Sequence, residues 1–134
     1  MRRVLILSAA MLAGASGAAW ADCTSPRLTE ITGTFTDMRI CATGPTGSWK
    51  ELHRSDGNVE EQAQGPSSPA EVVATWRVEV GGLGLPVITY DYGSGGKYTY
   101  NVHQNGVGAN DYSFCNILTP LIEAARGNLV SGGC

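Results

Sequence analysis

The stretch Ala74–Val102, ATWRVEVGGLGLPVITYDYGSGGKYTYNV, decides the fold class of this 134-residue chain. Apolar or aromatic residues alternate with polar residues in three runs, at 76–80, 88–92 and 98–102. Because successive side chains of a β-strand point to opposite faces, this alternation indicates three strands that each bury one face. The breaks between the runs, GGLGLP and GSGG, are glycine-rich and typical of hairpin connections. The stretch therefore predicts three consecutive antiparallel strands.

Further short strands are expected on both sides of this stretch. MRICA (38–42) and SWKELHR (48–54) alternate in the same way, and Asp56-Gly57 is a strong turn signal after the second of them. The segment 117–130 is ambiguous. It fits a short helix, or a final strand that turns at Gly127-Asn128, and we favour the strand because the rest of the chain is β.

The number of strands and the supply of aromatic residues favour a closed sheet. Six to eight short strands joined by hairpins predict a small antiparallel up-and-down β-barrel, since closing a twisted sheet removes its exposed edges. A two-sheet β-sandwich is the alternative. The aromatic side chains expected to fill the interior are Trp76, Tyr90, Tyr92, Tyr98, Tyr100, Tyr112 and Phe114.

Residues 1–21 have the pattern of a secretory signal peptide. A positive start is followed by the apolar stretch 4–19, and Ala19-Trp20-Ala21 offers small residues for cleavage before Asp22. The alternative is an uncleaved membrane anchor, but the apolar stretch is short against the roughly 20 residues of a span. We therefore expect one mature domain, residues 22–134, with no membrane span, in the periplasm or secreted.

The charge of the chain excludes two classes of partner. The formal charge is −3, and removal of Arg2 and Arg3 with the leader would make it −5. Because the sequence has no cluster of basic residues, it lacks the positive surface of nucleic-acid binders, and anionic membranes are poor partners for the same reason. We expect a monomer that binds an unknown small molecule or protein.

Four cysteines, Cys23, Cys41, Cys115 and Cys134, indicate two disulfides in an exported domain. Two of the three pairings are favoured. Cys23–Cys134 with Cys41–Cys115 would join the chain ends, which are often close together, whereas Cys23–Cys41 with Cys115–Cys134 would close short loops. A metal site is disfavoured, since there is no C-x-x-C and no histidine close to a cysteine. No cofactor is expected.

Trp49, Glu51 and His53 are the most suggestive candidates for a functional site. On a strand they share one face, where the alternation calls for apolar residues. The group could form the polar end of a ligand pocket, to which Tyr90 and Tyr100 could add stacking surfaces. The structural alternative is a satisfied polar cluster at the barrel mouth, with the tyrosines in the core.

Two other functional classes stay open. Glu51 and His53 could act as a general acid/base pair of an enzyme, although no motif for a nucleophile or a phosphate site accompanies them. An inhibitor or envelope-stress protein could instead act through an exposed loop such as GPSSPAE (65–71). His103 falls on the opposite face from Tyr98 and Tyr100, and we expect it to be exposed to solvent.

The chain also resembles a group of small exported proteobacterial proteins of uncharacterised function. The order of its elements is similar to that of calycin-type barrels, which is an analogy of fold and implies no activity. The resemblance spans most of Ile40 to Cys134, with Ala74 in place of an expected glycine. It rests on Ile40-Cys41-Ala42, Trp49-x-Glu51-x-His53, Gly65-Pro66, Ala74-Thr75-Trp76, Ile88-Thr89-Tyr90-Asp91-Tyr92-Gly93, Tyr98-Thr99-Tyr100-Asn101-Val102, Phe114-Cys115 and Gly133-Cys134.

Overall fold

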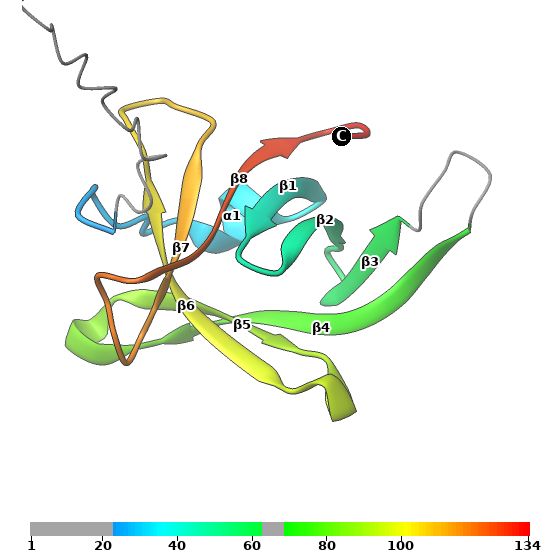
Figure 1. Cartoon of the computed structure of the whole chain (residues 1–134), viewed down its shortest axis with the longest axis horizontal. Coiled ribbons are helices and arrows are strands. Elements are labelled where there is room, and N and C mark those ends of the chain that lie inside the picture. The colour runs from blue at the N-terminus through cyan, green and yellow to red at the C-terminus, as the bar shows by residue number, and fades with distance from the viewer. Residues whose placement is uncertain (1–22, 63–68) are drawn as a thin grey trace, which may run out of the picture.

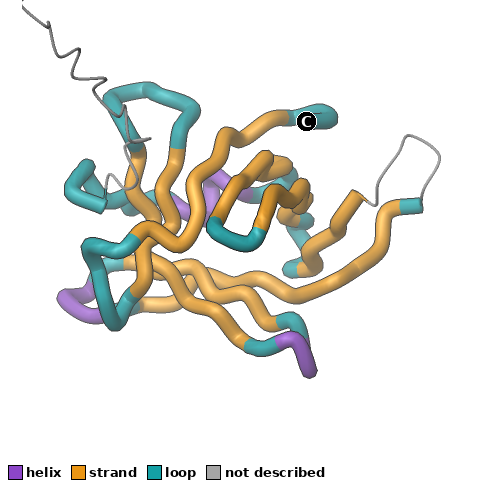
Figure 2. Tube along the Cα trace, in the orientation of Figure 1, coloured by secondary structure: helices purple, strands orange, loops and turns teal. Residues whose placement is uncertain are grey.

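The computed structural model describes residues 23–62 and 69–134, and in them the strands form one closed antiparallel barrel (Figures 1 and 2). Its strands are β1 (Met38–Gly44), β2 (Gly47–His53), β3 (Asn58–Gln62), β4 (Ala70–Val80), β5 (Pro86–Asp91), β6 (Lys97–Gln104), β7 (Tyr112–Asn116) and β8 (Glu123–Val130). Three short helical segments accompany them: α1 (Ile31–Phe35), η1 (Gly82–Gly84) and η2 (Gly93–Gly95). The predicted leader, 1–21, lies outside the described residues.

Each strand pairs with its sequence neighbour, and β1 also pairs with β8, which closes the barrel. Ile40 lies opposite Glu51 of β2 on one side and Leu129 of β8 on the other. The predicted up-and-down barrel is confirmed, and the sandwich is wrong. Residues 123–130 form a strand, as favoured, and this strand supplies the partner without which β1 would have an open edge. The expected turn at Gly127-Asn128 is wrong, because both residues lie inside β8 and pair with β1.

The inward faces fill the barrel as the alternation predicts. Trp76, Tyr90, Tyr112 and Phe114 are all buried, together with aliphatic residues from the other strands. Tyr98 is the exception among the predicted aromatic residues, since it lies near the end of the barrel and is 46% exposed. These side chains form one hydrophobic cluster, so most of the barrel interior is a packed core.

The short helix α1 closes one end of the barrel. Its residues Ile31 and Phe35 are 1% and 0% exposed. The Phe35 ring meets His53, Tyr112 and Phe114 edge-on, with ring centroids 5.2–5.9 Å apart. Because this end is plugged by side chains of the same chain, any opening must lie at the other end.

The N-terminal segment runs along the outside of the barrel and explains one disulfide. Leu28 N–H donates to the Val102 carbonyl, and Arg27 forms an isolated bridge with His103 on β6. This path brings Cys23 to Cys115 on the neighbouring strand β7, and the two form a disulfide with Cα atoms 5.9 Å apart.

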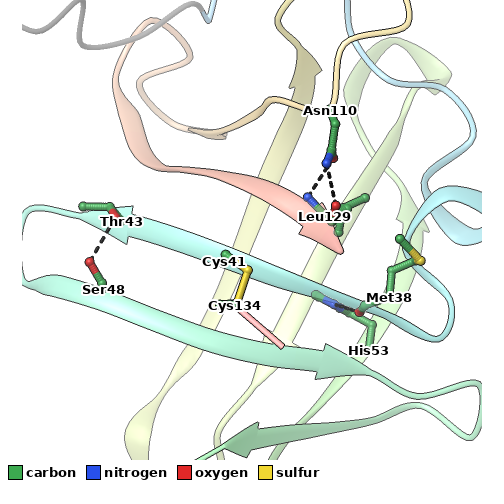
Figure 3. Close-up of a disulfide and its surroundings, with 8 residues drawn as sticks. All are labelled: Met38, Cys41, Thr43, Ser48, His53, Asn110, Leu129 and Cys134. Carbon is green, nitrogen blue, oxygen red and sulfur yellow. Dashed lines mark hydrogen bonds between the residues drawn. A yellow bond between two sulfur atoms is a disulfide. The ribbon is translucent and has the colours of Figure 1, made fainter. Parts of the chain in front are cut away.

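The second disulfide joins Cys134 to Cys41 on β1, with Cα atoms 5.8 Å apart (Figure 3). Cys134 follows β8, whose neighbour in the barrel is β1, so the closure of the barrel itself brings the two together. Both pairings that the sequence favoured are therefore wrong. The cysteines pair according to the order of the strands around the barrel. That order cannot be inferred from the proximity of the chain ends or from short loops.

His103 is also not where the sequence placed it. Its side chain does point outward, but it is only 6% exposed, and its Nδ1 is hydrogen-bonded to the Ser25 carbonyl. The N-terminal segment covers this outer face, so the expectation of a solvent-exposed histidine is wrong. The loop proposed for contact with partners, 65–71, falls mostly on residues outside the described part of the chain.

Candidate functional site

The candidate site lies at the end of the barrel opposite α1. There β2 places Trp49 and Glu51 on the inward face. Tyr90 of β5, Tyr92 just after β5 and Tyr100 of β6 line the same pocket. Glu51 is inward because the strict alternation of β2 leaves its side chain no other direction. The polar position that the sequence marked as unusual is therefore a real feature of the barrel interior.

Glu51 is only 6% exposed as a residue, and its carboxylate is held by one hydrogen bond. Tyr92 donates its hydroxyl proton to Glu51 Oε1 over 2.7 Å. Burial raises the pKa of Glu51, the Tyr92 bond opposes this rise, and the carboxylate of Glu61 on the adjacent strand β3 adds to it. The charged form of Glu51 therefore loses its hydration on burial and gains no cationic partner in return.

A small pocket of about 40 Å³ opens beside this carboxylate. Since a cavity needs roughly 10–15 Å³ to hold one water molecule, this one has room for only about three non-hydrogen atoms. Its walls are mainly aromatic. The pocket is lined by Ile40, Trp49, Glu51, Tyr90, Tyr92, Tyr100, Phe114 and Ala125.

His53 lies deeper on the same face of β2 and is fully buried, at 0% exposure. Its Nδ1 is 3.2 Å from the Met38 carbonyl, which can only accept, so Nδ1 carries the proton (Figure 3). Nε2 then accepts from the Tyr90 hydroxyl at 2.7 Å. Burial lowers the pKa of His53 to about 4, against a partly opposing effect of the Met38 carbonyl.

The structure therefore divides the predicted site. Trp49, Glu51, Tyr90 and Tyr100 meet at the small pocket, whereas His53 does not line it. Glu51 and His53 bind different tyrosines, and both ring nitrogens of His53 are occupied. In this arrangement His53 has no free nitrogen with which to take up a proton from a substrate.

Tyr92 is the residue of this site that the sequence did not single out. It was expected only as core packing, yet it donates the hydrogen bond that fixes Glu51. Its position two residues after Tyr90 placed it on the inward face, but nothing in the sequence indicated that its hydroxyl meets a carboxylate.

A second buried polar cluster lies on the outer face of β7 and β8. Ser113 donates to Glu123 Oε2 and accepts from Asn105 Nδ2. Ser113 is 0% exposed, and the register places it opposite His103. The residue types suggest catalysis, but a fully enclosed serine whose hydroxyl is already hydrogen-bonded serves here to satisfy buried polar groups.

Within residues 23–62 and 69–134, no group of three or more His, Cys, Asp or Glu side chains could hold a metal ion. None of the helices in these ranges has the length and hydropathy to cross a membrane.

Comparisons of the chain with protein-family models, with curated proteins and with solved structures give no match.

Proposed function

We propose that this chain is a non-enzymatic binding module that recognises an ammonium group at the open end of its barrel. The observation that carries the proposal is the Glu51 carboxylate, buried beside a pocket whose walls are aromatic. A buried carboxylate without a cationic partner is costly, and a ligand cation would offset that cost.

The aromatic walls support a cation over a neutral ligand. The negative faces of tryptophan and tyrosine rings attract ammonium groups, with about 0.5–2 kcal/mol for each well-placed contact. Trp49, Tyr92 and Tyr100 line the pocket together with the carboxylate. This combination of aromatic rings and one carboxylate is the chemistry of an ammonium site.

The volume of the pocket indicates how the ammonium group is presented. A space of about 40 Å³ admits the end of an alkylammonium chain but no complete metabolite of ordinary size. The ligand is therefore the tip of a longer molecule, and a lysine side chain of a partner protein has the required shape. His53 and α1 fill the barrel beneath, so the ligand enters from the open end only.

We also propose that the protein works outside the cytoplasm. Its two disulfides are stable in oxidising compartments, and residues 1–21 have the pattern of a cleaved leader. Periplasm or medium would both suit these features. N-terminal sequencing of the protein from a cell fraction would establish cleavage before Asp22.

The test is a titration with n-butylammonium, followed through NMR shifts of the Trp49 indole and the Glu51 amide. We expect saturable shifts in the wild type. Glu51→Gln, which keeps the shape of the side chain, should weaken binding about tenfold or more. Glu71→Gln is the matched control, because Glu71 is an exposed carboxylate outside the pocket. Equal binding by all three proteins would refute the proposal.

Two further arms sharpen the result. Binding should strengthen as the pH rises through the pKa of Glu51, because only the charged carboxylate attracts the cation. n-Butanol, which has the same chain without the charge, should not compete. A lysine peptide and its acetylated form then separate a protein partner from a free amine: only the unacetylated peptide should bind, and more tightly than n-butylammonium if a partner protein is the source.

A further inference from the structure

A larger cavity, separate from the pocket at Glu51, lies on the outside of the barrel. Its volume is about 360 Å³, within the range of roughly 300–1,000 Å³ typical of small-molecule sites. The η1 turn between β4 and β5 and the loop between β7 and β8 form its walls, and Figure 2 shows both beyond the strand ends. It is lined by Cys23, Arg27, Gly81, Gly82, Leu83, Val87, Thr99, Asn101, His103, Ile117, Pro120 and Leu121.

Large apolar side chains on these walls are left in contact with solvent. Leu83 is 96% exposed and Leu121 is 71% exposed, and Ile117 beside them is 45% exposed. Isolated exposed leucines are ordinary, but here several gather around one hollow. An apolar ligand in this cavity would remove their surface from water.

One positive charge lies among these apolar walls. Arg27 is held by a 2.8 Å hydrogen bond from Nη2 to the Pro86 carbonyl, while its Nε is buried without a hydrogen-bond partner. Over the ranges 23–62 and 69–134, no carboxylate forms an ion pair with Arg27. The guanidinium is therefore fixed in place but not neutralised.

One carboxylate, Glu79, is linked to the cavity wall through hydrogen bonds and does not change this balance. Glu79 accepts from Thr89, whose hydroxyl also meets that of the cavity residue Thr99, and Glu79 is ion-paired with Arg77 over 2.7 Å. Its charge is already matched, so Arg27 gives the cavity a net positive character. A ligand with a single negative charge would complement it.

We propose that this cavity binds an amphipathic monocarboxylate, a molecule with an alkyl chain and one carboxylate group. The carboxylate meets the guanidinium of Arg27, and the chain lies against Val87, Ile117 and Leu121. One guanidinium matches a single charge better than the double charge of a phosphate monoester. This site is independent of the proposed ammonium site, which lies inside the barrel and shares none of its lining residues.

The test uses decanoate, titrated into the oxidised protein below its micellar concentration and followed by calorimetry and NMR. Gly82→Phe provides a direct block, because a Cβ at Gly82 meets no atom within 4 Å and Gly82 lines the cavity. Gly132→Phe is the matched control: Gly132 has equally open surroundings but lies outside the cavity. We expect binding to be lost in the first variant and kept in the second.

A second matched pair tests the apolar wall. Leu121→Ser should weaken decanoate about tenfold, while Leu118→Ser should have no effect, because Leu118 is 87% exposed on the same loop but does not line the cavity. Thermal unfolding of each variant verifies that the fold is retained. Equal weakening in both leucine variants would overturn the proposed position of the chain.

The role of the charge is tested first by changing the ligand and then by substituting Arg27. Decanol should bind about tenfold more weakly than decanoate, and decyltrimethylammonium should not bind. Arg27→Gln should remove the preference for decanoate over decanol, and Arg27→Lys should retain part of it. Absence of decanoate binding to the wild type, or equal affinity for decanoate and decanol, would overturn the proposal.

Discussion

The two ends of the barrel are closed in different ways. At one end Phe35 of α1 packs against His53, Tyr112 and Phe114, and no polar atom of His53 lacks a partner. At the other end the buried Glu51 carboxylate has one tyrosine partner and a small pocket beside it. His53 and Glu51 are thus inward residues of the same strand, two positions apart. The polar atoms of His53 all have partners, whereas the charge of Glu51 is only partly satisfied.

This difference teaches that a polar residue inside a barrel is informative only together with its partners. His53 has an acceptor for its proton and a donor for its free nitrogen, so its neutral form is satisfied. Glu51 accepts one bond, and its charge has no counterion among the contacts described above. The hydrogen bonds of His53 are complete, whereas the charge of Glu51 is left without a counterion.

The largest expected effect is at the plugged end. Phe35→Ala would leave a cavity beneath α1 and should reduce the free energy of unfolding by about 3–5 kcal/mol. Tyr98→Ala at the open end should cost several times less, because Tyr98 is already 46% exposed. Urea unfolding of both variants measures the difference. Equal losses would mean that both ends contribute alike to stability.

The next effect is a dependence of stability on pH. The pKa of His53 is about 4 in the folded protein, below its ordinary value of 6.5, so the unfolded chain binds this proton more readily. Stability is therefore full above about pH 6.5 and falls as the pH drops towards 4, by about 3 kcal/mol in total. Urea unfolding between these pH values measures the slope.

The control for this titration is His53→Phe, which cannot titrate at that position. The variant should be less stable than the wild type at neutral pH, because the Tyr90 hydroxyl loses its partner, but it should lose less stability on acidification. An unchanged slope in His53→Phe would contradict the assignment of the slope to His53.

The smallest effect, of opposite sign, is expected at Glu51. Its pKa is raised in the folded protein, so stability falls as the pH rises from the ordinary value of 4.5 to the folded value. Glu51→Gln should abolish this component and should increase stability at neutral pH by about 1 kcal/mol. The same urea series on Glu51→Gln tests both. A loss of stability at neutral pH would show that the charged carboxylate is favourable where it lies.

Much of the fold was predictable because a barrel strand repeats one rule along its length. The alternation in Ala74–Val102 predicted the inward aromatic residues, and the same rule marked Glu51 and His53 as polar residues on an inward face. Alternation does not show which side chain forms a hydrogen bond with each inward polar residue. The Tyr92–Glu51 and Tyr90–His53 bonds depend on which strands lie opposite across the interior.

Other parts that sequence reasoning missed depend on segments without alternation. The N-terminal segment contains Pro26 and has no strand pattern, yet it covers His103 and brings Cys23 to Cys115. The five residues of α1 are too few to show a helical period, and they plug the barrel nevertheless. The cavity at Arg27 lies between such segments, which is why no motif indicated it.

The connectivity of the disulfides has a consequence for how the chain is oxidised. The bridges interleave, each spans more than ninety residues, and Cys41 lies between Cys23 and its partner. A chain that emerges from its N-terminus presents Cys23 and Cys41 to an oxidant long before either correct partner appears. A bridge formed between those two would have to be opened by a thiolate before β8 could close the barrel. The protein therefore depends on late oxidation or on disulfide exchange for its final pairing.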